Sequence, residues 1–234
     1  MPEFSICIPT YEYKGRGVEF LSHLFDTLEK QTIGDYEVII SDHSKDEEIY
    51  NLCESSSDKF DIKYYKNTEN RGSLSQNTNM CFKLATGKYI KPVYQDDFFY
   101  SDQTLEKIKD IFETTSCKWL ATACNHYEDA QGFFYRDFYP SFDNPVATLF
   151  GENLMSCPSV IAIRGDALLE FDENLKMLMD CEFYYRMYKT HGLPFLMNEV
   201  LMTNRSHSGQ SQQQEDFINA METERQYCYT KHAE

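Results

Sequence analysis

Positive charge is scarce in this sequence. It has 22 Lys and Arg against 38 Asp and Glu, which gives a formal net charge of −16. Proteins that bind nucleic acid need a basic face to displace counterions from the phosphates, and docking on anionic lipid also relies on basic residues. We therefore expect no nucleic-acid partner and no lipid docking through this chain alone. A small phosphorylated ligand in a local pocket remains compatible with the charge.

Long apolar segments are missing as well. The longest apolar runs, such as residues 4–9 and 193–197, fall far short of the roughly 20 residues that a membrane-spanning helix needs. The first residues, Met1-Pro2-Glu3-Phe4, show no basic and apolar leader. We therefore expect a cytoplasmic protein without a transmembrane segment; the alternative is peripheral association with the inner membrane face through a partner.

Several short motifs are absent. No pair among the eight cysteines has the C-x-x-C spacing of zinc or redox sites, so we expect reduced thiols. The sequence has no G-x-x-x-x-G-K-[ST] loop and no G-x-G-x-x-G after its first strand, which argues against P-loop hydrolysis and dinucleotide redox chemistry. It also has no G-x-S-x-G nucleophile elbow and no H-E-x-x-H grouping. Carboxylates and one late histidine are the remaining candidates for chemistry.

The first half of the chain alternates apolar strand patterns with amphipathic helix patterns. The expected strands are residues 5–8, 36–40, 62–65 and 88–94, and the expected helices are 18–31, 47–54, 74–84 and 102–114. Ser101 is the expected N-cap of the last of these helices. Such alternation predicts right-handed βαβ units, in which a mostly parallel sheet is covered by helices.

The second half is less regular. A hairpin of residues 119–126 and 133–138, a strand at 160–163, a helix at 179–190 and an extended segment at 195–202 precede a C-terminal helix. With 234 residues the chain can bury a sizeable core, and no repeat or linker divides it. We therefore expect a single α/β domain over residues 1–234, with a mostly parallel central sheet flanked by helices and a mixed second half.

Polar residues follow three of the predicted strands. They are Thr10-Tyr11-Glu12, Asp42-His43-Ser44 and Gln95-Asp96-Asp97. Ligands of open α/β sheets bind beyond the carboxyl ends of the strands, so we expect these side chains to converge on one crevice.

The adjacent carboxylates of Asp96 and Asp97 repel each other, which a bound cation or hydrogen-bond donors would relieve. Oxygen ligands suit magnesium or manganese, which keep positions open for phosphate oxygens. The alternative interpretation is a solvated acidic turn before a helix.

Taken in order, several of these motifs resemble those of the family-two inverting glycosyltransferases with the GT-A fold. The matching segments are SICIPTYE (5–12), EVIISD (37–42), NRG (70–72), NTN (77–79), ATGKYIK (85–91) and QDD (95–97). The resemblance is dense in the first half and scattered in the second. It implies a sugar-nucleotide half at residues 1–115, and an acceptor-side half with the C-terminal helix at 116–234.

The resemblance implies roles for residues of the first half. Pro9, Thr10 and Tyr11 would border the nucleotide base, and Asp42 would accept a hydrogen bond from it, which fits uracil or thymine. Arg71, in the middle of its turn, would reach the nucleotide.

The same resemblance assigns the acidic pair. Asp96 would approach the ribose or the metal shell, and Asp97 would hold a divalent metal, manganese or magnesium, that bridges the diphosphate. Gln95 stands where the family often has another acid, which leaves the number of metal-bound carboxylates open.

Two segments of the second half match the family as well. MDCEFYYR (179–186) resembles the acidic motif at the start of a helix, which makes Asp180 the expected catalytic base; a plain N-cap is the alternative. RSHSGQS (205–211) resembles the late Arg-x-His loop, where His207 would lie near the metal or the diphosphate.

The implied reaction is transfer of a sugar from a nucleotide-diphospho-sugar, UDP-linked by the Asp42 argument, to an acceptor hydroxyl with inversion. The acceptor would be a saccharide or a lipid-linked saccharide, and the usual setting is bacterial surface polysaccharide or glycoconjugate synthesis. One alternative is a sugar-nucleotide nucleotidyltransferase, for which Lys14-Gly15-Arg16-Gly17 is the only candidate loop. The other is a non-catalytic nucleotide-sugar-binding protein. The sequence leaves the oligomeric state unspecified.

Overall fold

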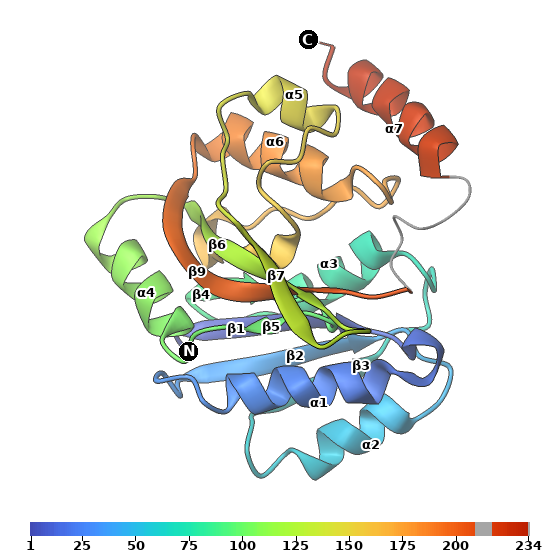
Figure 1. The fold of residues 1–234 in the computed structure, drawn as a ribbon, viewed down its shortest axis with the longest axis vertical. Coiled ribbons are helices and arrows are strands. Elements are labelled where there is room, and N and C mark those ends of the chain that lie inside the picture. Colours follow the sequence, from blue (N-terminus) through green and yellow to red (C-terminus); the bar gives the residue numbers. More distant parts are fainter. Residues whose placement is uncertain (209–216, 234) are drawn as a thin grey trace.

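A computed structural model describes residues 1–208 and 217–233. In this part of the chain, nine strands form one sheet in the order β3-β2-β1-β4-β8-β6-β9-β5, with β7 paired to β6 (Figure 1). The strands are β1 (Phe4–Thr10), β2 (Tyr36–Asp42), β3 (Ile62–Lys66), β4 (Tyr89–Pro92), β5 (Phe98–Phe99), β6 (Trp119–Glu128), β7 (Phe133–Phe138), β8 (Ile161–Arg164) and β9 (Phe195–Ser206). The fold is therefore a single α/β domain, as the alternating pattern predicted.

The strands of the first half run parallel. β1 pairs with β2 on one side and β4 on the other, and β2 pairs with β3. All seven residues of β1 are buried, which fits a central strand covered on both faces. In the β1–β2 register Thr10 lies opposite Asp42, so both strands end at the same edge of the sheet. This edge carries the polar residues that the sequence singled out.

Helices cover both faces of this parallel half (Figure 1). The helices are α1 (Gly17–Leu28), α2 (Glu48–Ser55), α3 (Leu74–Leu84), α4 (Thr104–Thr114), α5 (Pro145–Leu149), α6 (Met179–His191) and α7 (Phe217–Lys231). α1 and α2 lie on one side of the sheet and α3 on the other. α1 buries Leu21, Leu24, Phe25 and Leu28, which recur at helical spacing, and also Phe20.

The expected start of α4 was wrong. The N-cap is Gln103, and α4 begins at Thr104 rather than at residue 102. The Ser101 hydroxyl accepts a hydrogen bond from the Gln103 backbone N–H (3.2 Å), and its carbonyl accepts one from the Thr104 N–H (3.2 Å). Ser101 therefore closes a turn that precedes the helix, and the helix starts two residues later than expected.

The second half makes the sheet mixed. β8 runs antiparallel to β4 and to β6, β7 runs antiparallel to β6, and β9 lies parallel to β6. The predicted hairpin is present as β6 and β7. β9 extends to Ser206, beyond the predicted end at residue 202, and so carries Arg205 to the rim of the sheet.

The buried side chain of Glu37, in β2, links this strand to β1, to β3 and to the loop before β4. Glu37 accepts hydrogen bonds from the hydroxyl of Ser5 (2.6 Å) and from the backbone N–H and hydroxyl of Thr86 (2.7 and 2.9 Å), and it pairs with Lys63. The Gly87 N–H donates in turn to the Ser5 hydroxyl (2.8 Å). Gly87 packs so closely that a Cβ there would lie 2.5 Å from the Ser5 backbone nitrogen. A glycine is therefore required at this contact.

Two further features bear on the expectations from sequence. Within the described residues, no helix combines the length and apolar character that crossing a membrane requires. All eight cysteines lie in the described part of the chain, and each is a free thiol.

Candidate active site

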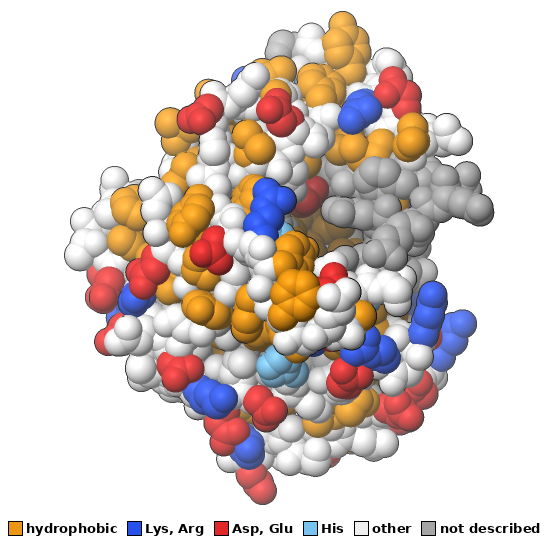
Figure 2. All heavy atoms as spheres, in the orientation of Figure 1, with side chains coloured by type: hydrophobic (Ala, Val, Ile, Leu, Met, Phe, Trp, Pro, Cys, Tyr) orange, Lys and Arg blue, Asp and Glu red, His pale blue; other side chains and the backbone are white. Residues whose placement is uncertain are grey.

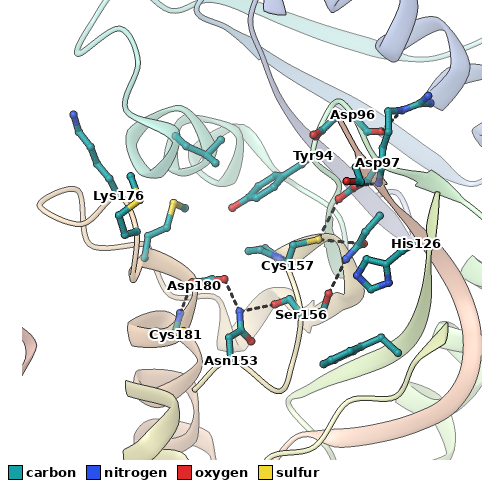
Figure 3. Close-up of a pocket in the computed structure, with 18 of the residues that line it drawn as sticks. Tyr94, Asp96, Asp97, His126, Asn153, Ser156, Cys157, Lys176, Asp180 and Cys181 are labelled. Atoms are coloured by element: carbon teal, nitrogen blue, oxygen red, sulfur yellow. Dashed lines mark hydrogen bonds between the residues drawn. The ribbon is translucent and has the colours of Figure 1, made fainter. Parts of the chain in front are cut away.

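A cavity of about 550 Å³ opens at the edge where β4 ends and α6 begins. Four of the predicted site residues line it: Tyr11, Asp96, Asp97 and Asp180. Figure 2 shows the molecule hollowed beside the β6–β7 hairpin, and Figure 3 shows Asp97 and Asp180 on opposite sides of this cavity. Two acids 83 residues apart in the sequence, at 97 and 180, thus face one space.

The acidic pair sits in the turn after β4. One Asp97 oxygen accepts from the Arg205 backbone N–H (3.0 Å), and the other accepts from the Cys157 thiol (3.1 Å). Burial, reinforced by the neighbouring charge of Asp96, raises the pKa of Asp97 to about 7. The carboxylate pair therefore lacks full compensation from protein donors, which is the environment that a cation stabilises.

Gln95 has a structural role. Its side-chain oxygen accepts from the Tyr11 backbone N–H (2.9 Å), and its side-chain nitrogen donates to the Gly17 carbonyl (2.7 Å). The buried amide therefore fastens the loop after β1 to the acidic turn. With both groups engaged by backbone, Gln95 is not arranged as a metal ligand.

Asp180 lies in the first turn of α6, whose N-cap is Leu178. The plain N-cap interpretation of Asp180 is therefore wrong. Its carboxylate accepts from the Cys181 N–H (2.8 Å) and from the Asn153 side-chain amide (2.7 Å). Burial raises the pKa of Asp180 to about 6, although these two hydrogen bonds favour the charged form. A carboxylate with a pKa near working pH is suited to taking a proton.

Another helix supports the start of α6. The Glu224 carboxylate, on α7, accepts from the backbone N–H groups of Lys176, Met177 and Leu178 (2.9, 2.9 and 2.8 Å). Glu182 also reaches this helix: it is fully buried and binds Arg186 (2.7 Å) and Lys231 (2.7 Å). Glu182, the second acid of the motif, therefore forms contacts that hold α6 and α7 together.

Asp42 does not line the cavity with Asp97 and Asp180. Its fully buried carboxylate accepts from the Thr10 hydroxyl (3.2 Å), the Ser44 N–H (2.9 Å), the Tyr64 hydroxyl (2.7 Å) and the Lys66 ammonium (3.2 Å). These donors take up the four acceptor positions that a carboxylate offers. The expectation that the polar residues after all three strands converge on one crevice is therefore wrong for Asp42, and recognition of the base by Asp42 stays a prediction.

Of the other nucleotide-binding candidates, Tyr11 and Asp96 line the cavity, whereas Pro9, Thr10 and Arg71 do not. Pro9 and Thr10 are buried in β1, and Arg71 is exposed in the turn between Asn70 and Gly72, both of which have positive φ. Tyr11 stacks on Tyr13 with ring centroids 3.8 Å apart. The roles of Pro9, Thr10, Tyr11 and Arg71 toward a nucleotide stay predictions.

His207 contacts the acidic pair directly. Its Nε2 lies 3.0 Å from an Asp96 carboxylate oxygen, and the ring packs against Phe20. Residues 209–211 of its motif lie outside the described residues. The structure thus places His207 beside Asp96, while its role toward a metal stays a prediction.

Arg205 is a residue whose importance the sequence did not reveal. Its Nε donates to the Asp96 carbonyl (2.9 Å), and its Nη1 pairs with Asp129 at the hairpin turn (2.6 Å). Since its backbone also binds Asp97, Arg205 ties the acidic turn to the hairpin. The motif resemblance points to His207, and only the geometry of β9 shows which residues Arg205 contacts.

Lys91 and Tyr94 are two more residues that sequence reasoning missed. Lys91 is fully buried under the acidic turn and donates to the Ser159 carbonyl; burial lowers its pKa to about 7. The Tyr94 hydroxyl is buried near the side chain of Thr78 and makes no hydrogen bond of good geometry among the described residues. Tyr94 lines the cavity between Asp97 and Asp180 (Figure 3). The strand pattern of residues 88–94 does not indicate that Lys91 is buried under the acidic turn or that Tyr94 lines the cavity.

The donor set can be tested against a divalent metal. Within residues 1–208 and 217–233, no cluster of three or more His, Cys, Asp and Glu side chains is arranged to hold an ion. Asp97 and Asp96 nevertheless offer adjacent, incompletely compensated carboxylate oxygens at the cavity wall. Magnesium and manganese take oxygen ligands and are held by one or two carboxylates plus substrate phosphates and water. The residues therefore fit an ion whose shell a diphosphate completes.

An α/β domain with an acidic turn after a central strand and an acidic helix start across one cavity is the GT-A type of glycosyltransferase fold. The chain belongs to glycosyl transferase family 2, whose family profile matches residues 5–171. The family is the one that its sequence motifs resembled.

Two curated relatives are uncharacterized glycosyltransferases of Rickettsia. The one from R. prowazekii is 23% identical over 219 residues, which cover 90% of this chain and 66% of that protein. The one from R. felis is 25% identical over 178 residues, covering 73% of this chain and 27% of that protein. The chain thus spans about two thirds or less of the length of these relatives.

Solved structures show the same fold. TarS of S. aureus, residues 1–349 in complex with UDP-GlcNAc, has a TM-score of 0.72 at 17% identity and covers 95% of this chain and 65% of that one. The mannosyltransferase PcManGT from Pyrobaculum calidifontis, in complex with GDP-Man and Mn²⁺, has a TM-score of 0.62 at 15% identity, covering 87% and 56%. At these identities the likeness concerns the fold.

Proposed function

We propose that this glycosyltransferase is metal-dependent and inverting, and that it transfers a sugar from a UDP-linked donor to an acceptor hydroxyl. The observation that carries the proposal is the placement of Asp97 and Asp180 on one cavity, with the Asp180 pKa near 6. The two solved neighbours were determined with UDP-GlcNAc and with GDP-Man and Mn²⁺, which supports a nucleotide-sugar and a divalent ion.

In this proposal Asp180 takes the proton of the acceptor hydroxyl. The acceptor oxygen then forms a bond to the anomeric carbon on the face opposite the leaving group. The bond from that carbon to the diphosphate oxygen breaks, and the electron pair leaves with the nucleoside diphosphate. Because one displacement occurs, the configuration inverts.

Asp97, with Asp96 beside it, would hold the divalent ion. Such an ion supplies positive charge to the diphosphate as negative charge develops there. Residues 1–115 would bind the nucleotide, and residues 116–234 the saccharide or lipid-linked acceptor. By analogy with the family, the proposal includes a cytoplasmic enzyme of bacterial surface polysaccharide or glycoconjugate synthesis.

One of the two basic residues in the loop that the nucleotidyltransferase alternative needs is engaged elsewhere. The Arg16 guanidinium pairs with Glu19 (2.6 Å) and Asp129 (2.6 Å), so it is already engaged by two acids. Release of pyrophosphate from a nucleoside triphosphate would be the observation that revives this alternative.

The first test is a thermal-shift screen of nucleotide-sugars with and without manganese. A ligand that binds only the native state raises the melting temperature by mass action. We expect a UDP-sugar to stabilise the protein more in the presence of manganese, and Asp97→Ala to abolish the manganese effect. Equal shifts with and without the ion in the wild type would contradict the metal role.

The second test addresses the base. Asp180→Asn keeps the shape of the side chain but removes its basicity, so transfer should fall by about a hundredfold or more while UDP-sugar binding persists. Transfer within about tenfold of wild type would remove Asp180 from the mechanism. Donor binding without hydrolysis or transfer by the wild-type protein would favour the non-catalytic alternative.

A further inference from the structure

The β6–β7 hairpin presents aromatic side chains to solvent beside the cavity. β7 pairs only with β6 among the described strands, so its other edge is open. Phe133 is 44% exposed, Phe134 50% and Tyr135 47%. In Figure 2 the hydrophobic side chains gather at the front of the molecule, next to the hollow. Consecutive exposed aromatics are costly on a surface without a binding role.

Four rings on one face of the hairpin form a continuous series, which we call the aromatic row: Phe133, Tyr135, His126 and Phe138. The ring centroids of Phe133 and Tyr135 are 6.2 Å apart, those of Tyr135 and His126 5.6 Å, and those of His126 and Phe138 6.3 Å. Tyr135, His126 and Phe138 line the same cavity as Asp180. The row therefore leads from the exposed tip of the hairpin into the candidate active site.

The row also carries one unsatisfied polar atom. The Nδ1 atom of His126 is buried and has no hydrogen-bond partner among the described residues. Burial lowers the pKa of His126, so its ring is neutral at physiological pH. A buried polar atom without a partner is uncommon and suggests a partner that is absent from the structure. The cavity wall beside His126 also includes Arg136, which supplies further donors.

Phe134 occupies the opposite face of β7. Its ring packs edge-on against Tyr127 at 5.2 Å and against Tyr100 at 5.8 Å. Unlike Tyr135, it does not line the cavity. Two adjacent aromatics of nearly equal exposure thus differ in whether they face the candidate active site.

We propose that the aromatic row is the acceptor-binding surface and that its occupant is a saccharide. The inference rests on the proposed function. Pyranose rings have an apolar C–H face, which packs on aromatic rings, and a rim of hydroxyls. The hydroxyls would pair with the polar atoms of Tyr135, His126 and Arg136, whereas a hydrocarbon chain would leave those atoms unpaired. The direction of the row brings a sugar hydroxyl toward Asp180.

The test compares matched variants on an array of printed oligosaccharides. We expect the wild-type protein to bind a subset of glycans. Tyr135→Ala should weaken binding to these by about tenfold or more, while Tyr135→Phe, which keeps the ring, stays within about threefold. Phe134→Ala is the control of equal exposure on the other face, and its glycan binding should match the wild type. Phe133→Ala provides a second variant of the row if Tyr135→Ala does not fold.

The remaining outcomes each decide against the proposal. Equal losses of glycan binding in Phe134→Ala and Tyr135→Ala would show that both rings affect binding only through folding. If Tyr135→Ala dissociates a dimer, the aromatic row is an interface between two copies of this chain. Wild-type binding to vesicles of neutral lipid but to no glycan would make it a lipid site. UDP-sugar binding by a wild-type protein that ignores every glycan would leave the proposed function standing and overturn this inference alone.

Discussion

The side-chain amide of Asn153 donates a 2.7 Å hydrogen bond to the carboxylate of Asp180. The same amide nitrogen donates to the Ser156 carbonyl (3.1 Å), so the loop before residue 158 and the start of α6 are held together. This contact favours the charged form of an acid whose burial favours the neutral form. Asn153 is therefore one of the donors that lower the pKa of Asp180 against the effect of burial, together with the Cys181 backbone N–H.

The pH profile of transfer should report this balance. Because the base must be deprotonated, kcat/KM should rise tenfold per pH unit below about 6 and level off above it. Asn153→Ala removes a donor to the charged form, so the Asp180 pKa should rise and the acid limb should move up by roughly one pH unit. Asn174→Ala, outside the cavity, is the control. An unmoved limb in the Asn153 variant would contradict the coupling.

Tyr94→Phe should stabilise the protein. The variant removes a buried hydroxyl that makes no hydrogen bond of good geometry among the described residues, which relieves a desolvation cost of about 1–3 kcal/mol. Urea unfolding at neutral pH measures the change. Tyr184→Phe serves as comparison, because its hydroxyl donates to the Ser156 carbonyl (3.0 Å) and its loss should destabilise. A destabilised Tyr94 variant would mean that its hydroxyl is satisfied in solution.

Gly87→Ala should destabilise the parallel half. The new Cβ would lie 2.5 Å from the Ser5 nitrogen and 2.7 Å from the Phe4 carbonyl carbon, both of them backbone atoms that cannot rotate away. Overpacking of this kind costs about 1–3 kcal/mol. Gly34→Ala is the matched control, since a Cβ there meets nothing within 4 Å. Thermal unfolding of the two variants should separate them clearly.

Gln95→Glu should weaken the fold without improving metal binding. The change replaces the amide that donates to the Gly17 carbonyl (2.7 Å) with an oxygen, and it adds a third carboxylate beside Asp96 and Asp97. A buried charge without a partner costs several kcal/mol. Manganese affinity, followed by calorimetry with UDP present, should be no higher than in the wild type. A tighter manganese site would show that Gln95 can join the ligand shell.

The sequence predicted the architecture well because its signals are local. Apolar runs such as Ile6 to Ile8 and the helical spacing of α1 and α3 need no tertiary information. The sharing of one cavity by Asp97 and Asp180 followed from strand-end geometry and the family resemblance together. The start of α4 was missed because Ser101 can close a turn as well as cap a helix.

The contacts that engage Asp42 and Arg205 within the protein could not be predicted from the sequence. The donors that fill the Asp42 carboxylate come from three different segments, at Thr10, Ser44, and Tyr64 with Lys66. The clamp of Arg205 on Asp129 joins residues 76 positions apart. Such pairings depend on how loops close over the sheet edge, which no periodicity encodes.

Glu224 fastens α7 to the start of the helix that carries Asp180. α7 lies beyond residue 171, where the family match ends. The Glu224 carboxylate nevertheless accepts hydrogen bonds from three backbone amides immediately ahead of the turn that carries Asp180. Loss of this carboxylate would leave three amides without an acceptor just ahead of the proposed base, so the position of Asp180 depends in part on a segment outside the family match.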